Sequence, residues 1–170
     1  MNCPSCGHEN IDGSDRCENC LAPFRDLDIP SADAAEGLAR SVMEDNLSQL
    51  DREDTLSVSP DMPAAEVARR MKAANLGCAL VLDGTKLVGI FTEHDVLLRM
   101  TGADKDLAAV TVKELMSPNP ETLHERDSVA AALNKMSLGR YRHIPFMKSD
   151  GSHAVASIKS VLKYIAQEDW

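Results

Sequence analysis

Four cysteines near the start of the chain have the spacing of a metal site. Cys3 and Cys6 form one C-x-x-C pair, and Cys17 and Cys20 form a second pair after a short polar segment. Each pair makes a tight turn that directs two thiolates at one ion, and two pairs complete a tetrahedron around zinc with Zn–S bonds of about 2.3 Å. The spacing therefore predicts a zinc site with these four cysteines as ligands. Iron is the main alternative metal.

Two other uses of these cysteines fit the sequence less well. Disulfides need an oxidising compartment, and no signal peptide is visible at the start of the sequence. A redox C-x-x-C normally opens a helix in a βαβ unit, whereas here the motif occurs twice in a short polar segment. A segment this short cannot build a hydrophobic core, so metal binding would supply its folding energy.

Residues 1–26 resemble the short zinc ribbons at the N-termini of many bacterial proteins. The match consists of Cys-Pro-x-Cys-Gly-His-Glu-Asn followed by Cys-Glu-Asn-Cys, and it departs at Leu21, where such ribbons usually have Gly. Zinc ribbons contact either nucleic acids or proteins. Residues 1–30 contain two arginines against six acidic side chains. We therefore expect protein contact or a structural role, and no binding of nucleic acid.

The composition predicts a folded, acidic protein. Hydrophobic residues make up 44% and charged residues 26% of the 170 residues, which is ordinary for a globular domain. The net charge of −9 repels polyanions and also argues against nucleic acid as a partner. No apolar run approaches the roughly 20 residues of a membrane span. We expect a cytoplasmic protein without a membrane segment.

The rest of the chain repeats itself at a constant offset of 65 residues. The end of the repeat reads GIFTEHDVLL in the first copy, residues 89–98, and AVASIKSVLK in the second, residues 154–163. Such a duplication predicts two stacked copies of one supersecondary unit. The copies differ in one functional group, because Asp95 in the first corresponds to Ser160 in the second.

The sequence pattern predicts the same order of elements in both copies, namely strand, helix, hairpin and helix. Apolar residues at the 3.6-residue period indicate the helices, and extended runs around an Asp-Gly pair indicate the hairpins. Asp61 and Asp127 are the expected caps of the first helix in each copy, and a separate helix is expected at 34–44. The elements are expected at 55–59, 63–74, 78–82 with 86–91, and 93–100, then at 121–124, 128–138, 144–147 with 153–157, and 159–166.

This order resembles the cystathionine β-synthase (CBS) domain, and the pair of copies resembles the two-copy Bateman module. The matching segments are 89–95 (GIFTEHD), 141–145 (YRHIP) and the lead-in 112–116 (VKELM), to which Val42-Met43 would correspond in the first copy. The resemblance implies an α+β fold of tandem β-α-β-β-α repeats behind a small zinc ribbon. The expected domains are a zinc ribbon at 1–26, a linker at 27–37, and CBS motifs at 38–104 and 105–170.

The resemblance also implies a nucleotide site built from both copies. In CBS pairs, a Thr/Ser-x-x-Asp of one copy faces the first strand and the start of the second strand of the other. A carboxylate such as Asp95 accepts two hydrogen bonds from the neighbouring hydroxyls of a ribose, and Arg142 and His143 would meet phosphates. The implied site residues are Thr92, Asp95, Pro120, Glu121, Thr122, Arg142, His143, Ile144 and Pro145.

The corresponding second site lacks the groups that would bind a nucleotide. Ser157 and Ser160 would face Gly77 and Cys78 in place of the basic pair. We therefore expect the second site to be empty or weak. The groups of the first site also have simpler explanations, because an Asp is favoured at a helix start without a ligand and a basic pair can be a solvated strand end.

Together these features predict a regulatory protein that is not an enzyme, because no nucleophile–base pair or open metal site is apparent. Glu93 and His94 are expected to face solvent. The CBS pair would bind an adenine nucleotide (AMP, ADP or ATP) or an adenosyl ligand at one site, and the zinc ribbon would dock an unknown protein. The resemblance implies a homodimer. The alternatives are a ligand-free dimerisation scaffold and a nucleic-acid-binding regulator that uses the ribbon.

Overall fold

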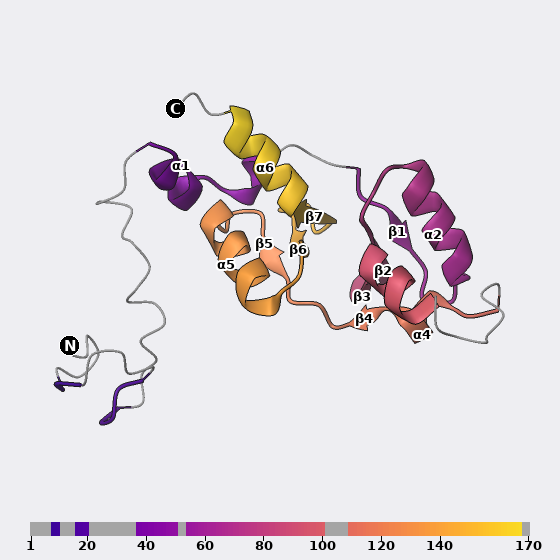
Figure 1. Ribbon diagram of the computed structural model, residues 1–170, viewed down its shortest axis with the longest axis horizontal. Helices are drawn as coiled ribbons and strands as arrows, with labels where there is room; N and C mark the ends of the chain where they lie inside the picture. Colours follow the sequence, from indigo (N-terminus) through magenta and orange to yellow (C-terminus); the bar gives the residue numbers. More distant parts are fainter. Residues whose placement is uncertain (1–7, 11–15, 21–36, 51–53, 101–108, 168–170) are drawn as a thin grey trace. The chain divides into compact units, whose positions relative to one another are not determined.

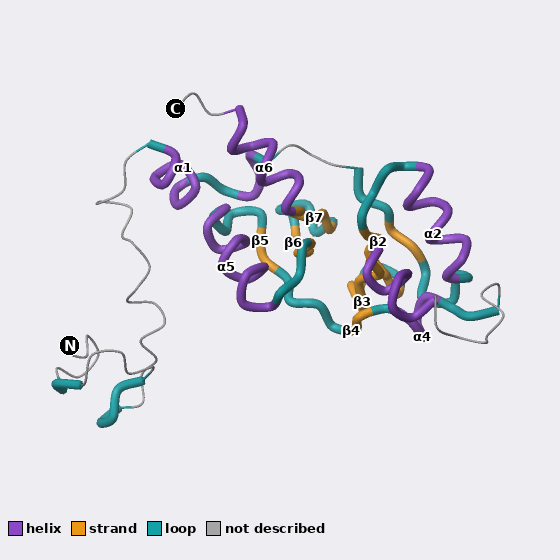
Figure 2. Tube along the Cα trace, in the orientation of Figure 1, coloured by secondary structure: helices purple, strands orange, loops and turns teal. Residues whose placement is uncertain are grey.

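Two sheets with their helices form the body of the protein. The structure is a computed structural model that describes residues 8–10, 16–20, 37–50, 54–100 and 109–167. It divides into two compact units, residues 1–40 and 41–170. The larger unit contains a four-stranded and a three-stranded sheet, and Figure 1 and Figure 2 show helices packed on both. The expected α+β class with tandem repeats is therefore confirmed.

The first repeat builds the four-stranded sheet, in the order β1-β2-β3-β4. β1 (Ser57–Val58) lies parallel to β2 (Cys78–Asp83), because the connection between them passes through helix α2 (Ala64–Ala73). β3 (Lys86–Thr92) returns antiparallel to β2, and β4 (Ser117–Pro118) pairs with the other edge of β3. β1, β2, β3 and α2 lie within two residues of their predicted positions, whereas β4 was not predicted.

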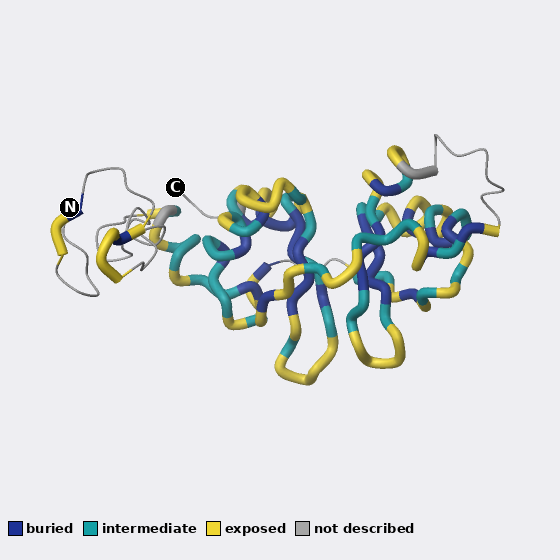
Figure 3. The backbone as a smooth tube through the Cα atoms, turned by 90° about the horizontal axis from the view of Figure 1, so that it is seen from below, coloured by how far each residue is buried: buried dark blue, intermediate teal, exposed yellow. Residues whose placement is uncertain are grey.

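The second repeat builds the three-stranded sheet with the same topology. β5 (Leu123–His124) lies parallel to β6 (His143–Met147), and helix α5 (Val129–Gly139) connects them. β7 (His153–Ser157) then pairs antiparallel with β6. In both repeats the strands are largely buried and the hairpin turns are exposed (Figure 3).

Each repeat closes with a helix, and the two helices differ in form. In the second repeat, α6 (Ile158–Gln167) is a regular α-helix. In the first, α3 (Glu93–Asp95) passes directly into a π-helix at Val96–Met100. The predicted single helix over 93–100 is therefore a short α-helical turn followed by a wider one. Within the described part of the chain, no helix is long and apolar enough to cross a membrane.

The core of each repeat is mostly aliphatic, in keeping with a sequence that has only six aromatic residues. Met71 on α2 and Met136 on α5 occupy the same place in the two repeats, and each is 3% exposed. Val67 and Phe91 are fully buried in the first repeat, and Val129 is fully buried in the second. The 3.6-residue pattern of the two helices therefore identified their buried faces correctly.

The segments that lead into the repeats are exchanged between them. The 3-10 helix η2 (Leu47–Gln49) precedes the first repeat but packs in the core of the second, where Leu47 is 1% exposed. Helix α4 (Val112–Leu115) precedes the second repeat but packs in the core of the first, where Val112 is fully buried. The exchange is symmetric, because Asn46 bridges Ser128 and Thr111 bridges Pro63, which are the same pair of positions shifted by the repeat offset.

This exchange corrects the lead-in predicted for the first copy. Val42 and Met43 were expected to match the lead-in of the second copy, but both belong to helix α1 (Leu38–Glu44). The segment equivalent to Val112 begins at Leu47, which donates its N–H to the Asp127 carbonyl at 3.0 Å as Val112 does to the Met62 carbonyl at 2.9 Å. The repeat therefore keeps its ungapped register upstream of the first strand.

The predicted helix caps are wrong by one or two residues. Ser128 caps α5, because its hydroxyl accepts a hydrogen bond from Ala131 N at 3.1 Å. Asp127 instead accepts a bond from His124 N at 2.8 Å and so closes the turn after β5. The residue before α2 is Pro63, which provides no side-chain cap, and Asp61 lies outside the cap position.

Two side chains of the second repeat hold Glu121, which lies in the segment that enters β5. Tyr141 Oη donates a hydrogen bond to Glu121 Oε2 at 2.7 Å, and Lys135 Nζ bonds to the other oxygen of the same carboxylate. Hydrogen bonds from Lys135 and Tyr141 lower the pKa of Glu121. Burial, followed by the bond to Glu121, raises the pKa of Tyr141 to about 12. Gly139 leaves room for the tyrosine ring, since a Cβ there would overlap it.

The raised pKa of Tyr141 predicts a loss of stability at alkaline pH. A tyrosine in the unfolded chain has its ordinary pKa of 10.0, whereas in the folded protein the pKa of Tyr141 is about 12. The free energy of unfolding should therefore fall as the pH rises through this window, and Tyr141→Phe should remove this part of the fall. Urea unfolding of both proteins between about pH 8 and pH 12 measures the effect. A difference between them that stays constant over this range would contradict the prediction.

Candidate functional site

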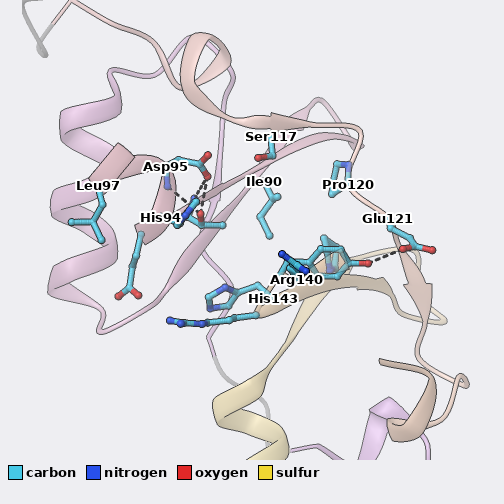
Figure 4. Close-up of a pocket in the computed structure, with 14 residues that line it drawn as sticks. Ile90, His94, Asp95, Leu97, Ser117, Pro120, Glu121, Arg140 and His143 are labelled. Carbon is cyan, nitrogen blue, oxygen red and sulfur yellow. Dashed lines mark hydrogen bonds between the residues drawn. The ribbon is translucent and has the colours of Figure 1, made fainter. Parts of the chain in front are cut away.

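A cavity of about 570 Å³ lies where the two repeats meet (Figure 4). The end of β3 and the first turn of α3 form one side, and the segment before β5 with the start of β6 forms the other. Pockets for small molecules typically measure roughly 300–1,000 Å³, so this cavity has the size for a nucleotide-sized ligand.

Most of the residues predicted for a nucleotide site line this cavity. Thr122 and Ile144 are the two that do not. Thr122 Oγ1 donates a hydrogen bond to the Pro120 carbonyl at 3.2 Å. Ile144 is fully buried in the core, because successive side chains of a strand point to opposite faces and its neighbour His143 takes the cavity side. The predicted residues that line the cavity are Thr92, Asp95, Pro120, Glu121, Arg142, His143 and Pro145.

Thr92 and Asp95 form a reciprocal capping box at the start of α3. Asp95 N donates to Thr92 Oγ1 at 3.4 Å, and Thr92 N and Oγ1 donate to Asp95 Oδ2 at 2.9 Å and 2.7 Å. The Asp95 side chain is 4% exposed and lines the cavity. The capping bonds hold this carboxylate at the wall of the cavity.

Two arginines on the opposite side give the cavity positive charge. Arg142 is exposed at the start of β6, where the sequence predicted it, and Arg140 was missed. Arg140 ends α5 in the left-handed conformation with φ of 54°, as Asn75 does at the same place in the first repeat with φ of 55°. The left-handed conformation costs an ordinary residue about 1 kcal/mol, while Asn adopts it more readily. The repeat alignment with Asn75 was the available signal for this turn.

The other lining residues that the sequence did not assign to the site adjoin the predicted ones. Glu93 and His94 are exposed, as expected, yet they also line the cavity, because the first turn of α3 carries them beside Asp95. The carboxylate of Glu121 is engaged by Lys135 and Tyr141, which keeps its pKa low and the group charged. The unassigned lining residues are Ile90, Glu93, His94, Leu97, Ser117, Arg140 and Tyr141.

The equivalent place on the other side of the repeat pair holds a cavity of only about 10 Å³. Its lining includes the residues that correspond, at the repeat offset, to Glu121 and to the segment 141–143 of the large cavity. These residues are Leu56, Leu76, Gly77 and Cys78. A space of this size cannot hold a nucleotide.

The two serines of this second site bond to each other. Ser160 N donates to Ser157 Oγ at 2.9 Å, and Ser157 N donates to Ser160 Oγ at 2.9 Å. Both side chains are buried, with 3% and 1% exposed. The serine pair therefore caps the start of α6 as Thr92 and Asp95 cap α3.

Half of the predicted zinc site lies in the described residues. Cys17 is buried and Cys20 is exposed, whereas Cys3 and Cys6 fall outside the residues that the structure describes. Asn10 Nδ2 donates a hydrogen bond to Cys17 Sγ at 3.7 Å, and Asn10 Oδ1 accepts one from Glu18 N at 2.9 Å. In the described ranges no three Cys, His, Asp or Glu side chains gather as metal ligands. The zinc site thus stays a prediction.

Comparison with known proteins identifies both repeats. The family model described as "CBS domain" matches residues 40–102 and 112–167. The CBS domain-containing protein CBSCBSPB5 of Arabidopsis thaliana is 31% identical over 118 residues, which cover 68% of this chain and 22% of that protein. The chain thus spans about a fifth of the length of this curated relative.

Solved structures show the same fold. The CBS-domain protein ATU1752 from Agrobacterium tumefaciens is 28% identical with a TM-score of 0.60, over 66% of this chain and 90% of that one. The CBS domain pair of protein MJ0100, solved with 5′-methylthioadenosine and S-adenosyl-L-methionine, is 19% identical with a TM-score of 0.63, over 72% of this chain and 96% of that one. Because the family model matches both repeats, this chain belongs to the CBS domain family and carries a pair of CBS domains.

Proposed function

We propose that this chain is a regulatory protein whose CBS pair binds one adenosine-containing ligand in the 570 Å³ cavity. The observation that carries the proposal is the composition of the cavity wall. It combines a nearly buried carboxylate, Asp95, with two arginines and with the apolar side chains of Ile90 and Pro145. These are the groups needed for a ribose, a phosphate and a purine ring respectively.

The ligands of a relative support the adenosyl class. The CBS pair of MJ0100 is solved with two molecules that share an adenosine and carry no phosphate. The present cavity offers the Asp95 carboxylate for a ribose and the guanidinium groups of Arg140 and Arg142 for a phosphate. We therefore expect AMP, ADP or ATP to bind more tightly than an uncharged adenosyl ligand.

Regulation follows from the origin of the cavity wall in both repeats. Thr92 and Asp95 come from the first repeat, and Arg142 and His143 come from the second. A ligand that contacts both sides stabilises the conformation in which the two repeats are close enough for it to bind. It can shift the equilibrium between conformations of the CBS pair only by the difference between its affinities for them.

Titration calorimetry with AMP and with 5′-methylthioadenosine tests the ligand and the roles of its contacts. Asp95→Ala should weaken both ligands by about tenfold or more, because both contain the ribose. Arg142→Ala should weaken AMP alone, because only AMP has a phosphate. Ser160→Ala is the matched control, since this side chain caps the equivalent helix at the small cavity and should leave both affinities unchanged. Absence of heat with both ligands in the wild-type protein would rule out the proposed site.

A second role, as a dimerisation platform, is favoured by exposed leucines on the closing helices. Leu97 and Leu98 in the first repeat are 62% and 66% exposed, and Leu162 in the second is 60% exposed. Leu97 and Leu162 occupy the same position of the repeat. Large apolar side chains at repeat-related positions suit a self-complementary surface, so we propose that a second copy of this chain covers them.

Light scattering after gel filtration tests this platform. Leu162→Lys should shift the protein from dimer to monomer, because a buried lysine at an apolar interface is costly. It should leave AMP affinity unchanged, since Leu162 does not line the cavity. Leu138→Lys provides the control, because this residue is 72% exposed and belongs to α5, not to a closing helix. A wild-type monomer, or dimers with both variants, would exclude this surface.

We also propose that the N-terminal cysteines bind one zinc ion and that this ribbon docks a protein partner. The contact from Asn10 Nδ2 to Cys17 Sγ supports the proposal, because ligand thiolates are commonly stabilised by such N–H donors. The acidic surroundings of the ribbon favour a protein over a nucleic acid as its partner.

Elemental analysis of the purified protein tests the zinc site. We expect one zinc per chain in the wild type and a loss of zinc in Cys17→Ser, because four thiolates are needed to close a structural site. Cys78→Ser is the control, since this cysteine is buried in the first CBS repeat and should have no effect on metal content. A metal-free wild type, or iron in place of zinc, would contradict the assignment.

A further inference from the structure

His143 lies between the two cavities of the CBS pair. Its imidazole lines the large cavity, where Figure 4 shows it on the side opposite Asp95, and it also lines the small cavity. The residue begins β6, and its backbone pairs with Ser157 of β7. One side chain of the proposed ligand site therefore reaches into the place where a second ligand site would be.

The tip of this imidazole rests against the bare backbone of Gly77. A Cβ added at Gly77 would lie 2.6 Å from His143 Nε2 and 2.9 Å from His143 Cε1, closer than side-chain atoms pack in proteins. Gly77 is not among the glycines with positive φ in the described part of the chain, which are Gly37, Gly84 and Gly151. The backbone conformation thus does not require glycine at this position, and the space for the imidazole does.

Gly77 is itself fixed to the helix that carries the carboxylate. Its carbonyl accepts a hydrogen bond from Glu93 N at 3.0 Å, at the first residue of α3. The equivalent bond in the second repeat joins Ile158 N to the Arg142 carbonyl, also at 3.0 Å. Gly77 and Arg142 are therefore equivalent positions of the two repeats. The large cavity has an arginine at this position, and the small cavity has a residue without a side chain.

We infer that Gly77, a residue of the small second cavity, is a positioning residue for His143 in the ligand site. This inference rests on the proposed function of the large cavity. The missing side chain at Gly77 lets the imidazole lie across both cavities, which holds the ring at the ligand site and helps to close the second one. The glycine at position 77 then accounts both for the small size of the second cavity and for the position of His143 in the first.

Gly77→Ala tests the inference because it adds one methyl group at the contact. The protein should still fold, since the overlapping atoms lie at the far end of a side chain and not in the backbone. In the ligand-free protein, the Cε1–H NMR signal of His143 should shift, while those of His124 and His153 stay in place. AMP affinity should fall about tenfold, the size expected for one displaced polar contact. His143→Ala combined with Gly77→Ala should bind AMP no more weakly than His143→Ala alone.

Gly84→Ala is the matched control for a glycine replacement. Gly84 has a φ of 61° with no atom within 4 Å of an added Cβ, so its replacement strains a turn without approaching His143. It should lower stability and leave the His143 signal and AMP affinity unchanged. An unmoved His143 signal in Gly77→Ala, or losses of affinity that add in the double variant, would overturn the inference. If the wild type binds neither AMP nor 5′-methylthioadenosine, the proposed function fails, and the His143 signal alone still decides whether Gly77 positions the ring.

Discussion

The mutual burial of the lead-in segments is the constraint on which the CBS pair depends. Each repeat completes its core with apolar side chains that precede the other repeat, Leu47 in one direction and Val112 in the other. Backbone hydrogen bonds fix both segments, as in the bonds from Val129 N to the Asp45 carbonyl and from Ala64 N to the Val110 carbonyl, each 2.9 Å long. A single repeat cut from the chain would lose part of its core, so the two repeats form one folding unit.

This exchange also places the wall of the large cavity. After α4 packs on the first repeat, the chain must return to the second, and it does so through β4 and the segment to Glu121. Ser117 pairs with Ile90 of β3 at one end of this crossing, and Lys135 and Tyr141 hold Glu121 at the other. The crossing segment is thus anchored to both repeats, and it borders the cavity because the cavity lies between its two anchors.

The sequence predicted the parts of this arrangement that depend on local patterns. The offset of the repeat, the hairpins and the buried faces of α2 and α5 follow from periodicity and turn residues, and the structure confirms them. The sequence could not reveal which repeat each lead-in joins, because Leu47 and Val112 have the same local pattern whichever core buries them. Ile144 was assigned to the site because it is next to His143 in the sequence. Neighbouring side chains of β6 point to opposite faces, and only His143 of the two lines the cavity.

The cap of α5 and the cavity residue Arg140 were not predicted, for a different reason. Asp127 and Ser128 are both good capping residues, and the choice between them depends on the turn after β5, which uses Asp127 for His124 N. Arg140 is by local preference a poor residue for a left-handed position, so its own residue type did not indicate the turn that brings it to the cavity.

The second repeat serves as an internal control for the function of the first. Ser157 and Ser160 close the start of α6 with the same reciprocal bonds that Thr92 and Asp95 make at α3. A hydroxyl is therefore enough for the cap, and the fold does not require a nearly buried carboxylate at Asp95. Arg140 is in a similar position, because Asn75 makes the equivalent turn at a lower conformational cost. Both Asp95 and Arg140 line the large cavity, so the proposed ligand, which needs a carboxylate and a cation, would explain both residues together.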